Sequence, residues 1–166
     1  MGQKHSHENY QTFDVNKNIY GQPLQSCQSD KNDLSGSWDT DGKCSELGGG
    51  VHQICVSNIP ANFSETTSQS DWSHDRNSRP HCLCLGAYAL YVAKGNSPDL
   101  DCDAIPENAF NPNYINKWST WNGNELPDQI KAGVNQLYDT CKEKKSALSS
   151  ERTYLRNLYK KMKQKM

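Results

Sequence analysis

The sequence turns from polar to apolar at Arg79-Pro80-His81-Cys82-Leu83-Cys84-Leu85-Gly86-Ala87-Tyr88. Two thiols and an imidazole stand within four residues there, at the entrance to the most apolar segment of the chain. We predict a short strand over residues 81–85 and a helix over residues 86–94, which Gly95 would end. Upstream, residues 51–59 are the best candidate for a second strand, which Pro60 would end.

The segments around these two strands differ in pattern. Residues 21–50 are rich in Gly, Ser, Asp and Asn, and residues 61–80 carry no apolar periodicity, so both predict loops. Asn111 and Pro112 are typical of a helix start and Gly123 of its end. Aromatic residues at helical spacing would turn this helix toward the core; they are Tyr114, Trp118 and Trp121.

Two more helices are predicted near the C-terminus. One begins near Pro127 and carries an apolar stripe in which Cys141 would pack as a small hydrophobic residue, beside Leu126, Ile130, Val134 and Leu137. The other covers about residues 150–163. The predicted fold class is therefore α+β, a small and mostly antiparallel sheet with irregular Gly-rich loops, followed by about three to four helices.

Composition and charge suggest three parts. The chain has 166 residues, 34% of them hydrophobic, and a mean hydropathy of −0.93. We predict a flexible arm over residues 1–20, a compact cysteine-containing domain over residues 21–141 and a basic helical tail over residues 142–166. The tail carries a net charge of +7 and the remainder −8. Neither a transmembrane segment nor a signal peptide is expected, so the prediction is an intracellular, reducing compartment.

Seven cysteines leave three interpretations open. They are buried inert thiols, a structural zinc site, or disulfide and redox chemistry. A reducing compartment disfavours disulfides. The candidate zinc ligands are Cys44, Cys55, Cys82 and Cys84, although no CxxC pair supports them.

A thiol-dependent enzyme or redox protein is the alternative that uses Cys82, Cys84 and His81 as catalytic residues. In an extended strand both thiols share a face with Cα atoms about 6.6 Å apart, and His81 points to the opposite face. A bond between them would be strained, and pairing with a strand neighbour such as Cys55 is easier. Common catalytic motifs such as HExxH and GxSxG are missing from the sequence, which counts against the common enzyme classes.

The basic tail predicts a non-enzymatic binding protein with an anionic partner. Nucleic acid in a nucleus or virion is favoured, an anionic membrane surface is the alternative, and a solvated helix that packs on the body or on a second copy is the simplest explanation. Lys160-Lys161-Met162-Lys163 resembles a nuclear-import signal, while Met1-Gly2-Gln3-Lys4-His5-Ser6 matches the myristoylation pattern at Gly2. The predicted anion-binding residues are Lys142, Lys144, Lys145, Arg152, Arg156, Lys160, Lys161, Lys163 and Lys165.

An ordered series of motifs resembles a small uncharacterised family, a domain of unknown function found widely in bacteria. The series is Pro23-Leu24-x-x-Cys27, Asp41-Gly42-Lys43-Cys44, Gly50-Val51-His52-Gln53-Ile54-Cys55 and His81-Cys82-Leu83-Cys84. The resemblance covers about residues 20–95. That family has a double cysteine in place of Lys43-Cys44 and a Pro-rich, Arg-containing segment in place of residues 61–80. Residues 102–127 look like an extension of eukaryotic or large-virus members. The resemblance implies a domain boundary and no activity.

Overall fold

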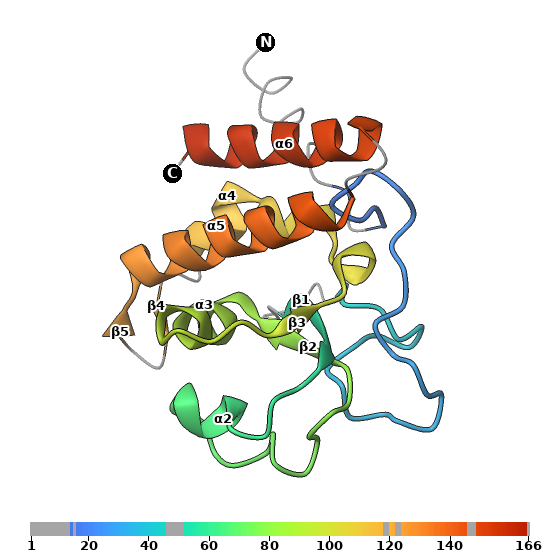
Figure 1. Cartoon of the computed structure of the whole chain (residues 1–166), viewed down its shortest axis with the longest axis vertical. Helices are drawn as coiled ribbons and strands as arrows, with labels where there is room; N and C mark the ends of the chain where they lie inside the picture. The colour runs from blue at the N-terminus through green and yellow to red at the C-terminus, as the bar shows by residue number, and fades with distance from the viewer. Residues whose placement is uncertain are drawn as a thin grey trace.

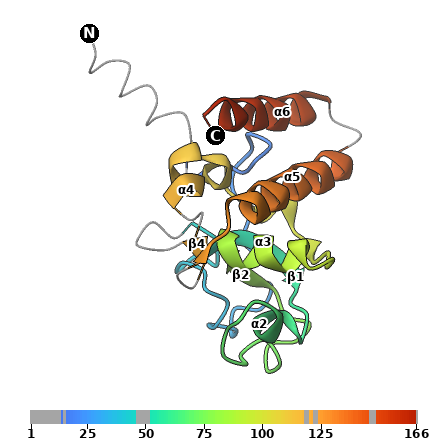
Figure 2. The same ribbon diagram turned by 90° about the vertical axis from the view of Figure 1, so that its left-hand side faces the viewer.

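The computed structural model places a small sheet against a stack of helices, which confirms the predicted α+β class (Figure 1). Helices α3, α5 and α6 lie one above another, with α2 and its loops at the opposite end of the molecule from α6 (Figures 1 and 2). Among the described helices, none is both long and apolar enough to cross a membrane. The structure describes residues 14, 16–45, 52–117, 120–121, 124–145 and 149–165.

The sheet has the order β2-β1-β3, with both pairings antiparallel. Its central strand β1 (His52–Asn58) matches the predicted strand closely, and β2 (His81–Cys84) stops one residue short of the prediction because Cys84 caps the next helix. Strand β3 (Asp99–Leu100) pairs with the far end of β1. Cys55 and Cys82 are directly opposite each other in the register.

The helix α3 (Leu85–Ala93) packs on α5 (Pro127–Lys144). Gly133 makes this close approach possible, since a Cβ placed on it would lie 2.6 Å from the Cβ of Ala89. The predicted apolar stripe of α5 is buried in the same core, at Ile130, Val134, Leu137 and Cys141.

Gly133→Ala is expected to lower the free energy of unfolding by about 1 to 3 kcal/mol, because the added methyl group must push the two helices apart. Urea denaturation measures the change. The double variant Ala89→Gly/Gly133→Ala removes the contact between the two Cβ atoms, but the new Cβ would still lie 2.8 Å from the Cα of residue 89, so it is expected to recover only part of the loss. A single variant as stable as the original chain would contradict this packing.

The structure of residues 102–125 differs from the expectation, which was a single helix over residues 111–123. Two short 3₁₀ turns, η1 (Cys102–Ala104) and η2 (Glu107–Phe110), lead into α4 (Pro112–Lys117), and the strands β4 (Thr120–Trp121) and β5 (Asn124–Glu125) form a hairpin after it. Asn122-Gly123 stands between the two strands in sequence and is a dipeptide typical of hairpin turns, so the sequence contained a hairpin signal beside the helix-end signal of the glycine. Trp118 and the side chains of Tyr114 and Trp121 lie outside the described residues.

The polar residues 61–80 also contain a short helix, α2 (Phe63–Thr66), which the absence of periodicity did not predict. Phe63 is fully buried and contacts the rings of Trp72 and Tyr91 at centroid distances of 5.8 and 4.9 Å. Burial of Phe63 therefore anchors a segment whose sequence is otherwise typical of a loop.

Contacts cross both predicted boundaries, at residues 20 and 142. Ile19 and Tyr20 are buried, and the Tyr20 hydroxyl donates a hydrogen bond of 2.6 Å to the carbonyl of Cys141. The last helix, α6 (Ser149–Gln164), packs on α5 and η2 and buries Leu155, Leu158 and Met162. The end of the predicted arm and the predicted tail thus both belong to the folded body.

Candidate functional site

A cleft of about 490 Å³ opens beside β2 and brings together four segments of the chain. Strand β2 supplies His81, Cys82 and Cys84, and β1 supplies His52. The loop before β1 supplies two serines, and the segment over residues 61–80 supplies an aromatic and polar wall. The lining includes Ser35, Ser37, His52, Phe63, Gln69, Asp71, Trp72, Asp75, Arg76, His81, Cys82, Leu83, Cys84 and Ala87.

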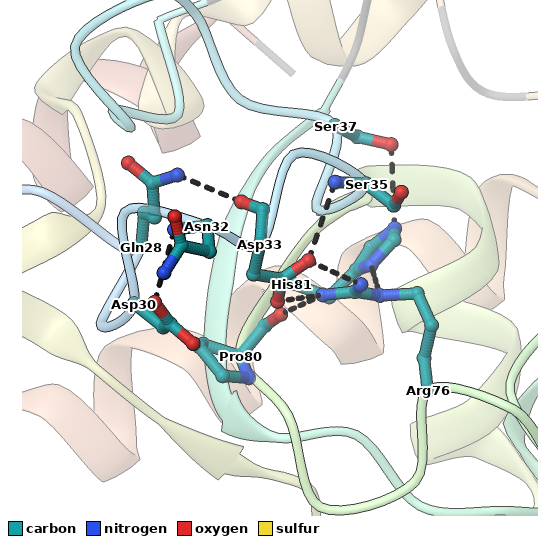
Figure 3. Close-up of polar contacts among 9 residues, drawn as sticks. All are labelled: Gln28, Asp30, Asn32, Asp33, Ser35, Ser37, Arg76, Pro80 and His81. Carbon is teal, nitrogen blue, oxygen red and sulfur yellow. Dashed lines mark hydrogen bonds and ion pairs between the residues drawn. The ribbon is translucent and has the colours of Figure 1, made fainter.

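Arg76 organises the cleft through a fork of hydrogen bonds (Figure 3). Its terminal nitrogens donate to both carboxylate oxygens of Asp33 at 2.8 and 2.9 Å, and one also donates to the carbonyl of Pro80 at 2.7 Å. The two side chains are 10% and 8% exposed. Hydrogen bonding to Arg76 lowers the pKa of Asp33 although partial burial opposes the shift. Such a bidentate, desolvated pair fixes the geometry of its surroundings.

The same arginine sets the tautomer of His81. Arg76 Nε donates to His81 Nδ1 at 2.8 Å, so the ring proton of the neutral imidazole sits on Nε2, which lies 3.3 Å from the Ser37 hydroxyl. Burial lowers the pKa of His81 to about 3, and the positive charge of Arg76 adds to the shift. Trp72 stacks on the ring at a centroid distance of 4.5 Å. His81 is therefore a neutral hydrogen-bond donor toward the cleft and not a base at neutral pH.

The low pKa of His81 predicts acid-sensitive stability. Below its ordinary value of 6.5, His81 takes up a proton in the unfolded chain but stays neutral in the folded one until about pH 3. Unfolding then binds a proton, so His81 contributes a loss of up to about 1.4 kcal/mol per pH unit as the pH falls through this window. Urea denaturation from neutral pH downward measures the slope. His81→Gln cannot titrate and is expected to show a shallower loss, and equal slopes would contradict the assignment.

The three predicted catalytic residues meet at the cleft, but the thiols are not poised for nucleophilic chemistry. Cys82 is bonded to Cys44. Cys84 is the free cysteine, and burial raises its pKa to about 11, which leaves almost no thiolate at neutral pH. All seven cysteines lie within the described residues, so the structure presents no exposed, activated thiol.

The structure contains three disulfides, and none of them is the pairing of Cys82 or Cys84 with Cys55 that the sequence analysis considered easier. They join Cys27 to Cys55, Cys44 to Cys82 and Cys102 to Cys141, with Cα separations of 5.9, 5.5 and 5.7 Å. The sequence analysis expected disulfides to be disfavoured, whereas the structure contains three. That expectation rested on the predicted reducing compartment and not on the geometry of the cysteines. Cys141 is not simply an apolar contact of α5, and Cys55 and Cys82 each bond to a loop cysteine rather than to each other across the sheet.

The predicted zinc ligands are not assembled as a set. Cys84 is outside the group of sulfur atoms that lie close together, and Cys27 takes its place: the Sγ atoms of Cys27, Cys44 and Cys82 are all within 4.8 Å of one another.

Sequence reasoning missed Arg76, Asp33 and Trp72. A large aromatic residue and an arginine four positions apart stand out in the Ser- and Asn-rich segment 61–80, and that contrast is the signal available in the sequence. Their partners were not accessible, because Asp33 lies 43 positions before Arg76 and no periodic pattern connects them.

Three of the predicted anion-binding residues are held by carboxylates of the body. Lys142 pairs with Asp139 at 3.6 Å, and Lys144 pairs with Asp99 at 3.6 Å and donates to the carbonyl of Leu100. Lys145 lies 3.0 Å from Asp103 and 3.4 Å from Glu151. These lysines balance local negative charge and are poor candidates for an external anion.

The remaining predicted residues lie on or just after α6. Arg156, Lys160, Lys161, Lys163 and Lys165 are exposed, and Arg152 is partly buried with its Nε lacking a hydrogen-bond partner among the described residues. Lys163 Nζ lies 5.2 Å from the ring centroid of Tyr159. Within the described parts of the chain, Arg156, Lys160 and Lys161 have no carboxylate at ion-pair distance. Gly2, the predicted lipidation site, lies outside the described residues.

Comparison with known proteins gives no relative for this chain. No protein-family model matches it, and neither a curated protein nor a solved structure is significantly similar. The resemblance carried by the ordered cysteine motifs therefore stays a prediction, and the function has to be argued from the geometry alone.

Proposed function

We propose that this protein is a non-enzymatic binding protein whose helix α6 engages an anionic polymer, with nucleic acid in a nucleus or virion as the favoured partner. The observation that carries the proposal is the division of α6 into two faces. Leu155, Leu158 and Met162 are buried against the body. Arg156, Lys160 and Lys163 recur at i, i+4 and i+7 and form an exposed basic stripe on another side of the helix.

Repulsion between the like charges of the basic stripe lowers the stability of the fold. Like charges at i, i+4 destabilise a helix by about 0.2 to 0.5 kcal/mol per pair. Lys142, Lys144 and Lys145 have their charge matched by body carboxylates, whereas Arg156 and Lys160 do not among the described residues. A row of phosphates would relieve this repulsion, and release of its counterions would favour binding.

The tyrosines of α6 support contact with a phosphate backbone rather than with bases. The hydroxyl of Tyr154 donates to Glu107 at 2.6 Å. Tyr159 stacks on Tyr138 at a centroid distance of 4.0 Å and donates to Asn135. Both side chains are committed to the body, so base stacking by these two residues would break existing contacts. The expected binding is therefore largely independent of nucleotide sequence.

The test is fluorescence anisotropy of a short labelled DNA duplex over a salt series. Arg156→Gln/Lys160→Gln is expected to weaken binding about 10-fold and to reduce the slope of log K against log salt by about 2, one for each lost phosphate contact. The control Lys31→Gln/Lys94→Gln removes the same charge from exposed body residues and is expected to change binding little. If the two double variants weaken binding equally, the interaction depends only on net charge, and the proposal that the basic stripe is the binding surface is rejected. Binding to phosphatidylserine vesicles without binding to DNA would reject nucleic acid as the partner.

The thiol-dependent enzyme is the less supported alternative. The cleft does gather Cys82, Cys84 and His81 beside the loop over residues 61–80, as that alternative requires. The disulfide at Cys82 and the raised pKa of Cys84 remove the nucleophile, and neutral His81 has its Nδ1 lone pair occupied by Arg76. What remains is a pocket that offers hydrogen bonds and an aromatic wall to a small ligand.

A further inference from the structure

Two disulfides lie side by side in the core and form a four-cysteine cluster, made of Cys27, Cys44, Cys55 and Cys82. Each bond joins a strand to a loop: Cys55 on β1 to Cys27, and Cys82 on β2 to Cys44. All four cysteines are at most 4% exposed. The Sγ atoms of Cys27, Cys44 and Cys82 lie within 4.8 Å of one another although they belong to two different bonds.

We propose that the four-cysteine cluster is a redox-dependent zinc site, which holds two disulfides when oxidised and one tetrahedral Zn²⁺ when reduced. A Zn–S distance of about 2.3 Å in a tetrahedron places sulfur atoms about 3.8 Å apart. Three of the sulfurs are already grouped on this scale. The fourth, on Cys55, starts within bonding distance of Cys27 Sγ, and its Cα faces that of Cys82 across the two strands. The proposed site requires rotation of the Cys55 side chain to bring this sulfur to the other three.

The positions of the four ligands do not depend on the disulfides alone. The backbone amide of Cys27 donates to the carbonyl of Gly42 at 2.8 Å, which holds the Cys27 loop beside the Cys44 loop. The amide of Cys82 donates to the carbonyl of Gly36 at 2.8 Å, and the β1–β2 pairing holds Cys55 opposite Cys82. The proposal requires that these backbone contacts keep the thiols gathered after the two disulfides of the cluster are reduced.

The conversion balances with a dithiol as reductant. Two dithiol molecules deliver four electrons and four protons, break both S–S bonds and leave as two cyclic disulfides, which produces four protein thiols. Zn²⁺ then displaces the four thiol protons to solvent and forms four Zn–S bonds, giving a centre with a net charge of −2. The metal restores the cross-links between strands and loops that reduction removes.

The experiment uses the full chain, reduced under anaerobic conditions with a dithiol and freed of reductant before addition of Zn²⁺ or Co²⁺ alone. The reduced protein is expected to bind one metal ion per chain, and Co²⁺ is expected to give the absorption of a tetrahedral site with four thiolate ligands. The oxidised protein is expected to bind neither ion at the cluster. Cys27→Ser is expected to weaken Zn²⁺ binding by about 100-fold or more, since loss of an outer-shell partner alone costs about 10- to 100-fold.

Cys84→Ser is the matched control, because it changes a buried cysteine two residues from Cys82 that lies outside the cluster. It is expected to leave metal affinity and the Co²⁺ spectrum unchanged. The proposal is overturned if the reduced original chain, whose folding does not depend on any substitution, binds no metal. It is equally overturned if the Co²⁺ spectrum reports fewer than four thiolates, or if Cys84→Ser weakens binding as much as Cys27→Ser.

Discussion

Cys102→Ala/Cys141→Ala is expected to lower the free energy of unfolding by about 4 kcal/mol, the loop-closure value for cysteines 39 positions apart. The bond ties the start of η1 to the last turn of α5, so its loss frees a long loop in the unfolded chain. It also loosens the end of α5, where the carbonyl of Cys141 accepts the Tyr20 hydrogen bond. Urea denaturation under non-reducing conditions measures the change.

Cys84→Ala is the control for this prediction. It also removes a buried sulfur, but it breaks no cross-link. We expect a loss of about 1 kcal/mol, in line with a small cavity. If the double variant loses no more stability than this control, the Cys102–Cys141 bond does not constrain the unfolded chain in solution.

Arg76→Ala is expected to lower the free energy of unfolding by about 3 to 5 kcal/mol, because it leaves the buried carboxylate of Asp33 without its partner. The substitution also removes the donors to His81 Nδ1 and to the carbonyl of Pro80. Arg76→Lys keeps the positive charge but cannot reproduce the fork, so it is expected to recover only part of the loss. Urea denaturation of the three proteins gives the comparison.

Lys142→Ala provides the surface reference. Lys142 and Asp139 have side chains that are 40% and 63% exposed, and such pairs contribute less than about 0.5 kcal/mol. Comparable losses for Arg76→Ala and Lys142→Ala would show that the Arg76–Asp33 pair is open to solvent. Arg76→Ala also reports on the cleft, because without the Arg76 hydrogen bond the His81 ring is free to change tautomer.

The elements with a clear apolar pattern and end signal were predictable from the sequence. Strand β1 and helices α3, α5 and α6 all lie within a few residues of their expected positions. The buried side chains of α5 and α6 recur at helical spacing, whereas those of β1 and α3 form continuous runs that end before Pro60 and Gly95. The hairpin after α4 was not predicted, since Gly123 fits a helix end as well as a turn. The pairing of β4 with β5 is local, since Thr120 pairs with Glu125 and Trp121 with Asn124, and the Asn122-Gly123 dipeptide was the sequence signal available for it.

The site was predictable only in part. The sequence singled out His81, Cys82 and Cys84, and the structure places all three at the cleft. The sequence did not indicate the protonation state of His81 or the oxidation state of Cys82. Both depend on distant partners, which are Arg76 and Asp33 for His81 and Cys44 for Cys82. Seven cysteines allow many pairings, and only the path of the loops around Gly36 and Gly42 selects among them.

The burial of Ile19 and Tyr20 has a consequence for the order of assembly during synthesis. The amide of Ile19 donates to the carbonyl of Ile105, Asn18 forms a β-bridge with Pro106, and Tyr20 bonds to the carbonyl of Cys141. This segment leaves the ribosome early, yet its partners emerge about 85 to 120 residues later. Nascent chains arrested before residue 105 are therefore expected to expose it to proteases and chaperones, which makes residues 18–20 a late addition to the body.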